Sequence, residues 1–191
     1  YLDTGAMYRT VGLLAVRTNT DRHDDAALAE LLKNADIRVL RVDGSQHMAL
    51  GGEDVEKLIR TPEISMAASD VASCPSVRRA LVALQQKIAA GCDVVMDGRD
   101  IGTRVLPGAD YKFFLTASDK VRAQRRYDEL KAKGESVTLQ EVLEDVRRRD
   151  EQDTTRAESP LTMADDATEV ETDDLGIDEV VTVLMALMGR F

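Results

Sequence analysis

Three charged residues continue the apolar face of a helix that the sequence predicts in its C-terminal half. The face runs through Val142 and Val146. Steps of three and four residues lead from it to Arg149, Asp153 and Arg156. Charged side chains are rarely buried without partners. Either this end of the helix faces a polar cleft that holds an anionic, hydroxyl-bearing ligand, or the three residues form a ladder of ion pairs on a protruding helix end.

A second candidate site is the hexapeptide Asp-Gly-Arg-Asp-Ile-Gly, residues 97–102, which follows a short apolar segment predicted to be a strand. Ligands of open α/β sheets bind at the carboxyl ends of the strands. The planar guanidinium of Arg99 suits phosphate, Asp100 offers an acceptor, and the two glycines allow close approach of the backbone. A tight turn in which Arg99 and Asp100 pair with neighbours is the alternative. The position after a buried strand favours ligand binding.

The first residues of the chain could also bind an anion. Asp3 and Thr4 are good N-cap residues for a helix, and the free N–H groups of a helix N-terminus attract anions. Arg9 lies one turn or so further on and could reach the same anion. An ordinary cap followed by a surface arginine would produce the same pattern, so both interpretations stay open.

Arginines are dense in residues 120–156, which are nearly balanced in charge although the whole chain carries a net charge of −10. Arg122, Arg125 and Arg126 share one side of a predicted helix, and further arginines follow in the next helix. Arginine forks are the usual counter-charge for a transferred phosphoryl group, so the pair of helices suits a phosphate-gripping lid. The alternative is a solvated helix pair held by ion pairs between successive turns.

Helices and strands alternate along most of the chain, which predicts an α/β fold with a mainly parallel sheet. Hydrophobic periodicity and capping residues predict helices over residues 5–18, 24–35, 61–73, 75–91, 118–133, 139–156 and 177–188. Buried strands are predicted over residues 93–96, 111–115 and 167–171, and a small hairpin over residues 37–42 and 47–50.

Composition excludes several classes of function. A net charge of −10, no tryptophan and 4% aromatic residues argue against a nucleic-acid-binding protein and against anionic membranes as partners. There is no apolar run of about 18 residues. Neither His23 nor His47 has Cys or Glu at ligand spacing, so no metal site is predicted. The expected location is the cytoplasm.

Taken together, the chain resembles the bacterial cytidylate kinases. The resemblance rests on Tyr1–Arg9, on residues 97–103 and on residues 149–156 followed by Pro160-Leu161, in matching order and spacing. It implies transfer of the ATP γ-phosphoryl group to CMP or dCMP, with Mg²⁺, to give CDP or dCDP. It also implies a P-loop NTPase-type parallel sheet sandwiched by helices. Residues 1–35 and 75–191 would form the core, with a lid at about 118–156. Residues of about 36–74 would form a nucleoside-monophosphate-binding insert that contains the hairpin.

The resemblance also implies a role for individual residues. The substrate-binding residues would be Thr4, Tyr8, Arg9, Ser69, Arg78, Arg99, Asp100 and Asp153; the catalytic arginines Arg99, Arg126, Arg149 and Arg156; and the lid arginines Arg122, Arg125 and Arg126. Asp100 would accept a hydrogen bond from the cytosine amine, with Ser69 and Arg78 as the other base-reading groups. Uracil carries an acceptor where cytosine has that amine, so Asp100 would disfavour UMP.

One departure from the family concerns ATP. The family begins with a strand and a phosphate-binding P-loop, G-x-x-x-x-G-K-[ST], and this sequence contains no Gly-Lys dipeptide. We therefore expect an N-terminally truncated monomer, marginally folded and inactive on its own, because ATP and Mg²⁺ are held mainly by that loop. The alternatives are a non-catalytic pyrimidine-nucleotide-binding module and a nucleoside monophosphate kinase with another base preference.

Overall fold

The computed structural model describes residues 1–189. The helices are α1 (Thr4–Arg17), α2 (Asp25–Lys33), α3 (Pro62–Ala72), α4 (Pro75–Ala89), α5 (Asp119–Ala132), α6 (Leu139–Thr155) and α7 (Ile177–Leu187). The strands are β1 (Leu2–Asp3), β2 (Ile37–Val42), β3 (Ser45–Leu50), β4 (Glu53–Asp54), β5 (Met96–Asp97), β6 (Phe113–Thr116) and β7 (Thr168–Glu171). Two short turns of helix, η1 (Leu58–Arg60) and η2 (Ile101–Val105), complete the element order.

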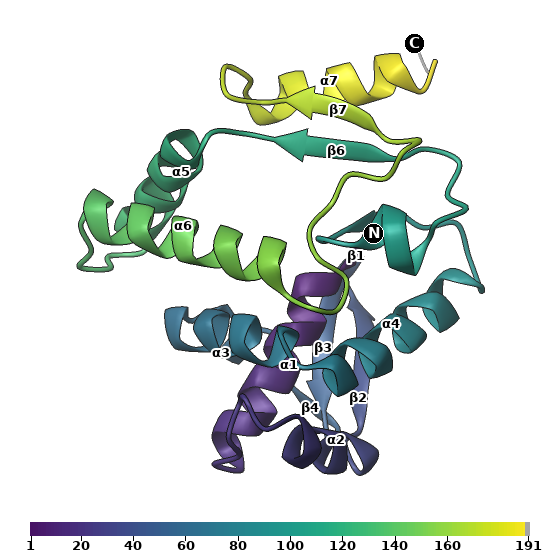
Figure 1. Ribbon diagram of the computed structural model, residues 1–191, viewed down its shortest axis with the longest axis vertical. Coiled ribbons are helices and arrows are strands. Elements are labelled where there is room, and N and C mark those ends of the chain that lie inside the picture. The colour runs from purple at the N-terminus through teal and green to yellow at the C-terminus, as the bar shows by residue number, and fades with distance from the viewer. Residues whose placement is uncertain (190–191) are drawn as a thin grey trace.

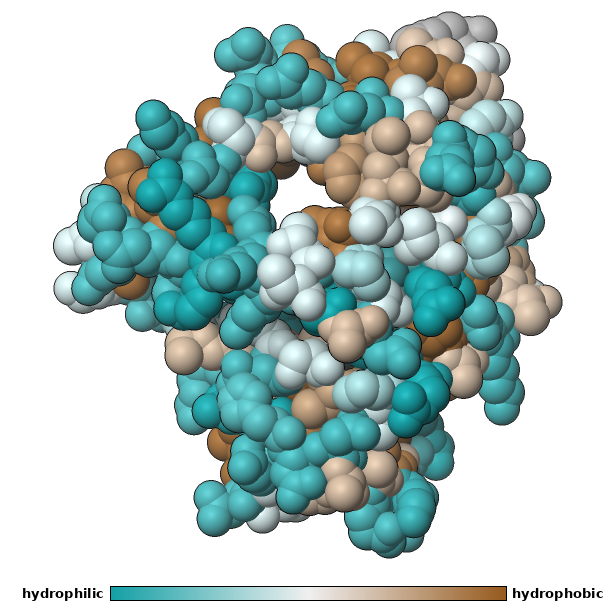
Figure 2. All heavy atoms as spheres, in the orientation of Figure 1, coloured by the Kyte–Doolittle hydropathy of each residue, from teal (hydrophilic) through white to brown (hydrophobic). Residues whose placement is uncertain are grey.

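The predicted α/β class is confirmed, since helices flank parallel strands (Figure 1). β1 pairs in parallel with β5, and β6 pairs in parallel with β7. Within residues 1–189 these pairs do not join into the single sheet that the sequence predicted. The segment after β5 forms the π-helical turn η2. An opening lies between the β6–β7 pair and α6 (Figure 2).

The predicted hairpin is confirmed as β2 and β3, joined by Asp43-Gly44. Both turn residues have positive φ, 49° and 80°, which is the backbone of the tight turn that matches strand twist. β4 adds a third, antiparallel strand. This small sheet packs against α1, so it helps to position the N-terminal end of that helix.

The main hydrophobic core surrounds α1. Met7 and Val11 are fully buried there, and they belong to one cluster with residues of the hairpin, α3 and α4, such as Met48, Val71 and Leu81. A second, much smaller cluster lies between α5 and α6 and consists of Ala123, Leu130 and Val142, with partly buried neighbours. The α5–α6 pair therefore has a core of its own.

Helix ends follow the predicted caps. The Asp3 side chain accepts from the backbone N–H of Ala6 at 2.9 Å and so caps α1. Thr138 and Glu141 form the predicted capping box of α6. The strand predicted over residues 93–96 corresponds to β5, which is shorter than predicted and begins further along the chain. Only Met96 and Asp97 find ladder partners, because β1 is two residues long. Within residues 1–189 every helix is too short or too polar to cross a membrane.

Candidate functional site

Asp153 links the two segments that the sequence singled out. Its carboxylate accepts from Nε of Arg99 at 3.0 Å and from Nη1 of Arg156 at 2.9 Å. Arg156 is almost fully buried, and its Nε donates to the carbonyl of Ser159 at 2.7 Å. Arg156 follows the last residue of α6 with extended backbone, which lets its side chain turn back toward Asp153. The charged end of α6 therefore faces the loop after β5.

Four arginines from four elements gather at this place. Burial lowers the pKa of Arg149, and the neighbouring charges of Arg99, Arg9 and Arg126 lower it further, against the effect of Asp153. Arg149 is exposed to solvent, and its desolvation comes from the protein atoms around it in the wall of a cleft. We call Arg9, Arg99, Arg126 and Arg149 the arginine cluster. Its members repel one another, so an anion between them would be strongly attracted.

The arginine cluster is only partly neutralised by carboxylates of the described residues. Arg99 pairs with Asp153 and Arg126 with Glu129, whereas Arg9 lies 3.9 Å from Asp3. Burial lowers the pKa of Arg9 as well, and Arg60 and Arg126 contribute through repulsion. The attraction of Asp3 and Asp97 opposes this effect but does not reverse it.

Arg60 belongs beside this cluster and was missed by the sequence analysis. Its guanidinium donates to Asp3 Oδ2 at 2.8 Å and pairs with Glu56. Arg60 ends the short turn η1, directly before the N-cap of α3. Nothing in the residues around it distinguishes it from an ordinary surface arginine, because Asp3 lies far away along the chain.

Arg78 and Asp100 form a buried ion pair, with side chains 4% and 5% exposed. The guanidinium of Arg78 also lies 5.5 Å from the centre of the Tyr8 ring. Burial is the main cause that raises the pKa of Tyr8 to about 12, so the phenol stays protonated at neutral pH. Arg78 and Asp100, both predicted to read the base, are thus paired with each other. Tyr8, which was also predicted to bind the substrate, lies beside them.

Thr4 and Gly98 pack together where β1 and β5 end. Thr4 Oγ1 donates to the carbonyl of Asp97 at 2.7 Å. A Cβ on Gly98 would lie 2.6 Å from Thr4 Oγ1, which is too close for any other residue. The close approach predicted for Gly98 therefore occurs, but its partner is the start of α1. Thr4 is 3% exposed, so it contributes to this junction.

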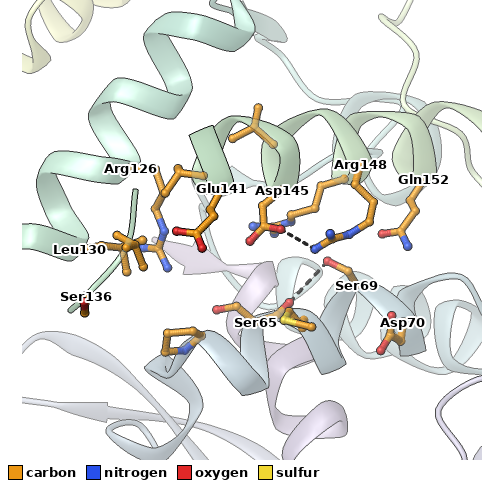
Figure 3. Close-up of a pocket in the computed structure, with 16 residues that line it drawn as sticks. Ser65, Ser69, Asp70, Arg126, Leu130, Ser136, Glu141, Asp145, Arg148 and Gln152 are labelled. Atoms are coloured by element: carbon orange, nitrogen blue, oxygen red, sulfur yellow. Dashed lines mark hydrogen bonds and ion pairs between the residues drawn. The ribbon is translucent and has the colours of Figure 1, made fainter. Parts of the chain in front are cut away.

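A cleft of about 370 Å³ lies between α3 and the α5–α6 pair. Figure 3 shows Ser65 and Ser69 of α3 opposite Arg148 and Gln152 of α6. Of the predicted site residues, the wall includes Ser69, Arg126 and Arg149. Ser69 Oγ donates within α3, to the carbonyl of Ser65 at 3.4 Å, and so remains available to a ligand as an acceptor.

Two predicted lid arginines lie apart from the arginine cluster. Arg122 forms a double hydrogen bond with Asp150, at 2.8 and 2.7 Å, and thereby joins α5 to α6. Arg125 donates to the carbonyls of Thr172 and Leu175 in the segment between β7 and α7. Of the three, Arg126 alone is brought to Arg9 and Arg149.

The described residues offer no set of metal ligands: no three His, Cys, Asp or Glu side chains of residues 1–189 lie close enough together to hold an ion. What they do offer is positive charge around a cleft, one bridging carboxylate and a buried Arg–Asp pair. Such groups bind and orient a phosphorylated, hydrogen-bonding ligand, and they stabilise developing negative charge by electrostatics.

Fold and cleft together define an α/β protein suited to a phosphorylated ligand. Comparison with known proteins is more specific: the profile of the cytidylate kinase family matches residues 1–190. The chain belongs to the cytidylate kinase family.

Similar proteins from several bacteria are named cytidylate kinase. That of Caldicellulosiruptor bescii is 46% identical over 190 residues, which cover 100% of this chain and 84% of the relative. That of Carboxydothermus hydrogenoformans is 48% identical and is covered to 86%. That of Bacillus subtilis is 45% identical over 185 residues, 97% of this chain and 83% of the relative. Matches along the whole chain favour the predicted kinase over the non-catalytic alternative.

Proposed function

We propose that this protein transfers the γ-phosphoryl group of ATP to CMP or dCMP, giving CDP or dCDP, and that the arginine cluster binds the reacting phosphates. The observation that carries the proposal is the placement of Arg126 and Arg149 in the wall of one cleft, on a helix pair whose Asp153 binds Arg99. A phosphate dianion would neutralise this charge. Membership of the cytidylate kinase family supports the same reaction.

In this reaction an oxygen of the acceptor phosphate attacks the γ-phosphorus of ATP. No covalent enzyme intermediate is required, so the protein contributes positioning and electrostatic stabilisation. We assign Arg9 and Arg99 to the acceptor phosphate. Arg126 and Arg149 would stabilise the charge that develops on the transferred group, and Arg156 would contribute from the far side of Asp153.

We assign recognition of the base to Asp100 and Arg78, with Ser69 on the cleft wall. Asp100 would accept from the cytosine amine, and Arg78 would donate to the ring acceptors. Because the two are paired in the structure, the base must separate them. Uracil would leave Asp100 facing an acceptor, which is a larger penalty than a lost contact. Tyr8 and Thr4 would support this site, and Asp153 with Arg149 would contact the sugar.

ATP and Mg²⁺ are the co-substrates that the family implies. Among residues 1–189 no three His, Cys, Asp or Glu side chains lie close enough together to hold an ion, and Mg²⁺ is commonly bound through nucleotide phosphates, so these residues need not form a metal site of their own. We propose that they serve the acceptor nucleotide, with Arg122, Arg125 and Arg126 in a lid over the ATP phosphates.

Residues of about 36–74 would form the nucleoside-monophosphate-binding insert, and the rest the core with its lid at about 118–156. The net charge of −10 supports small nucleotides as the ligands instead of nucleic acid. We further propose a monomer that works in the cytoplasm, where these nucleotides are metabolised.

Titration calorimetry with CMP, dCMP and UMP tests the proposal. CMP and dCMP should bind, and UMP should bind roughly tenfold more weakly, since an unpaired buried polar group costs about 1–3 kcal/mol and about 1.4 kcal/mol is a factor of ten. Arg149→Met should weaken CMP binding at least about tenfold. The matched control is Arg147→Met, since Arg147 pairs with Asp119 on the outside of the helix pair. Equal binding of CMP and UMP, or no effect of Arg149→Met, would refute the assignment.

A further inference from the structure

Buried polar atoms that lack a hydrogen-bond partner gather around Tyr8. Among residues 1–189 they include Tyr8 Oη, Arg78 Nε, Arg156 Nη2 and both amide atoms of Gln85. Such atoms cost free energy and call for an explanation. Tyr8, Arg78 and Arg156 already have roles in the proposed CMP site. Gln85 has none.

Gln85 occupies a specific place behind that site. It is 1% exposed and lies on the same face of α4 as Arg78, about two turns further on. Tyr8 of α1 contacts both: its ring lies against Arg78, and its hydroxyl is near enough to the Gln85 amide for that amide to lower its pKa slightly. The hydroxyl and the amide nevertheless do not meet in a hydrogen bond.

Two acceptors hold Arg78 in place in the free protein. Arg78 donates to Asp100 and, at 3.3 Å, to the carbonyl of Ala72. The Arg78 cation also lies over the Tyr8 ring, an attraction that couples the two side chains. A base that takes Asp100 and Arg78 as its partners would draw them apart, and Tyr8 would then shift with Arg78.

We propose that Gln85 is a positioning residue of the pyrimidine site: once CMP separates Arg78 from Asp100, the Gln85 amide N–H donates a hydrogen bond to the Tyr8 hydroxyl oxygen and holds the ring against Arg78. The inference rests on the proposed function. It means that the nucleotide-bound state satisfies polar groups that the free state leaves unpaired. Gln85 therefore favours binding without touching the ligand.

A double-mutant cycle in CMP affinity tests this. Gln85→Met and Tyr8→Phe should each weaken CMP binding about fivefold, the value of one neutral hydrogen bond, and the double variant should bind no more weakly than Tyr8→Phe alone. Without nucleotide, Gln85→Met should melt at the same temperature as the wild type or higher, because an unpaired buried amide is removed. Gln140→Met, at an exposed glutamine of α6 bonded to Glu144, is the control and should change neither quantity.

The outcomes separate this inference from the proposed function. A wild-type chain that does not bind CMP overturns both. If the wild type binds CMP, a Gln85→Met variant that melts lower with unchanged affinity shows a packing role and overturns the inference alone. If the losses of CMP affinity caused by Gln85→Met and Tyr8→Phe add in the double variant, the inference is likewise overturned. If Gln85→Met does not fold, Tyr8→Phe serves as the test, because it removes only the hydroxyl that the proposed bond requires. A CMP affinity unchanged by Tyr8→Phe overturns the proposal.

Discussion

At the scale of single residues, the site is built from charges that constrain one another. Asp153 accepts from two arginines at once, and Asp100 neutralises a buried one. A buried charge whose partner is removed is costly, typically a few kcal/mol. Each carboxylate therefore stabilises the free protein and is also placed to meet a ligand, so substitutions there should change both stability and specificity.

Asp100→Asn should relax the preference for cytosine. Asn keeps one acceptor oxygen but adds an N–H group that can donate to the carbonyl of uracil, so the ratio of CMP to UMP affinity should fall at least about tenfold. Unfolding should become easier by about 3 kcal/mol, because Arg78 loses its countercharge. Calorimetry and urea unfolding measure the two effects. Asp97→Asn, at an exposed carboxylate nearby, is the control; an unchanged CMP-to-UMP ratio in Asp100→Asn would contradict the assignment.

Tyr8 should make the protein sensitive to alkaline pH. Its pKa is raised from 10.0 to about 12 mainly by burial, so above pH 10 the unfolded chain loses the phenolic proton before the folded one. Stability is therefore complete below pH 10 and is lost as the pH rises toward 12, by about 1.4 kcal/mol for each pH unit. Urea unfolding at pH 9 and 11 should show this loss in the wild type and a smaller loss in Tyr8→Phe, where Tyr1 remains as a second tyrosine with a raised pKa. Tyr111→Phe, at an exposed tyrosine, is the control, and equal losses in wild type and Tyr8→Phe would disprove the explanation.

At the scale of elements, the junction of β1, β5 and α1 positions the arginine of the DGRD segment. The ladder there is only two residues long, so side-chain packing carries much of the contact. Gly98→Ala should destabilise the fold by about 1–3 kcal/mol, because the new Cβ meets Thr4 Oγ1. Combining it with Thr4→Ala should recover part of that loss, and the two costs should not add. Gly108→Ala is the control for urea unfolding, because a Cβ there meets nothing within 4 Å. If the costs of Gly98→Ala and Thr4→Ala are strictly additive, the clash is relieved elsewhere.

How far the sequence predicts these elements depends on whether their causes are local. The caps at Asp3 and Thr138 are local and were predicted, and so was the common face of Arg149 and Asp153 on α6. The contact of Arg60 with Asp3 and the burial of Gln85 beside Tyr8 depend on distant segments. No local pattern marks them. The same reasoning explains why β5 was predicted too long, since its length is decided by its partner strand.

At the scale of the whole molecule, two hydrophobic cores of unequal size are joined near the proposed site. The core around α1 is extensive, whereas that of the α5–α6 pair has three buried members. Because local stability follows buried apolar contact, the α5–α6 pair should open at a lower free energy than α1 and α4. The contact from Arg99 to Asp153 is one of the polar links that hold α6 to the larger part.

Native-state hydrogen exchange should reveal this difference and its dependence on nucleotide. Amides of α5 and α6 should exchange faster than those of α1 and α4 in the free protein. CMP contacts Arg149 on α6 and Arg9 on α1 in the proposed site, so it should slow exchange in α5 and α6 more than in α1. UMP at the same concentration is the control and should have a smaller effect, in proportion to its weaker binding. If CMP bound but protected only α1 and α4, the acceptor site would not include α6, and the roles assigned to Arg149 and Asp153 would have to be withdrawn.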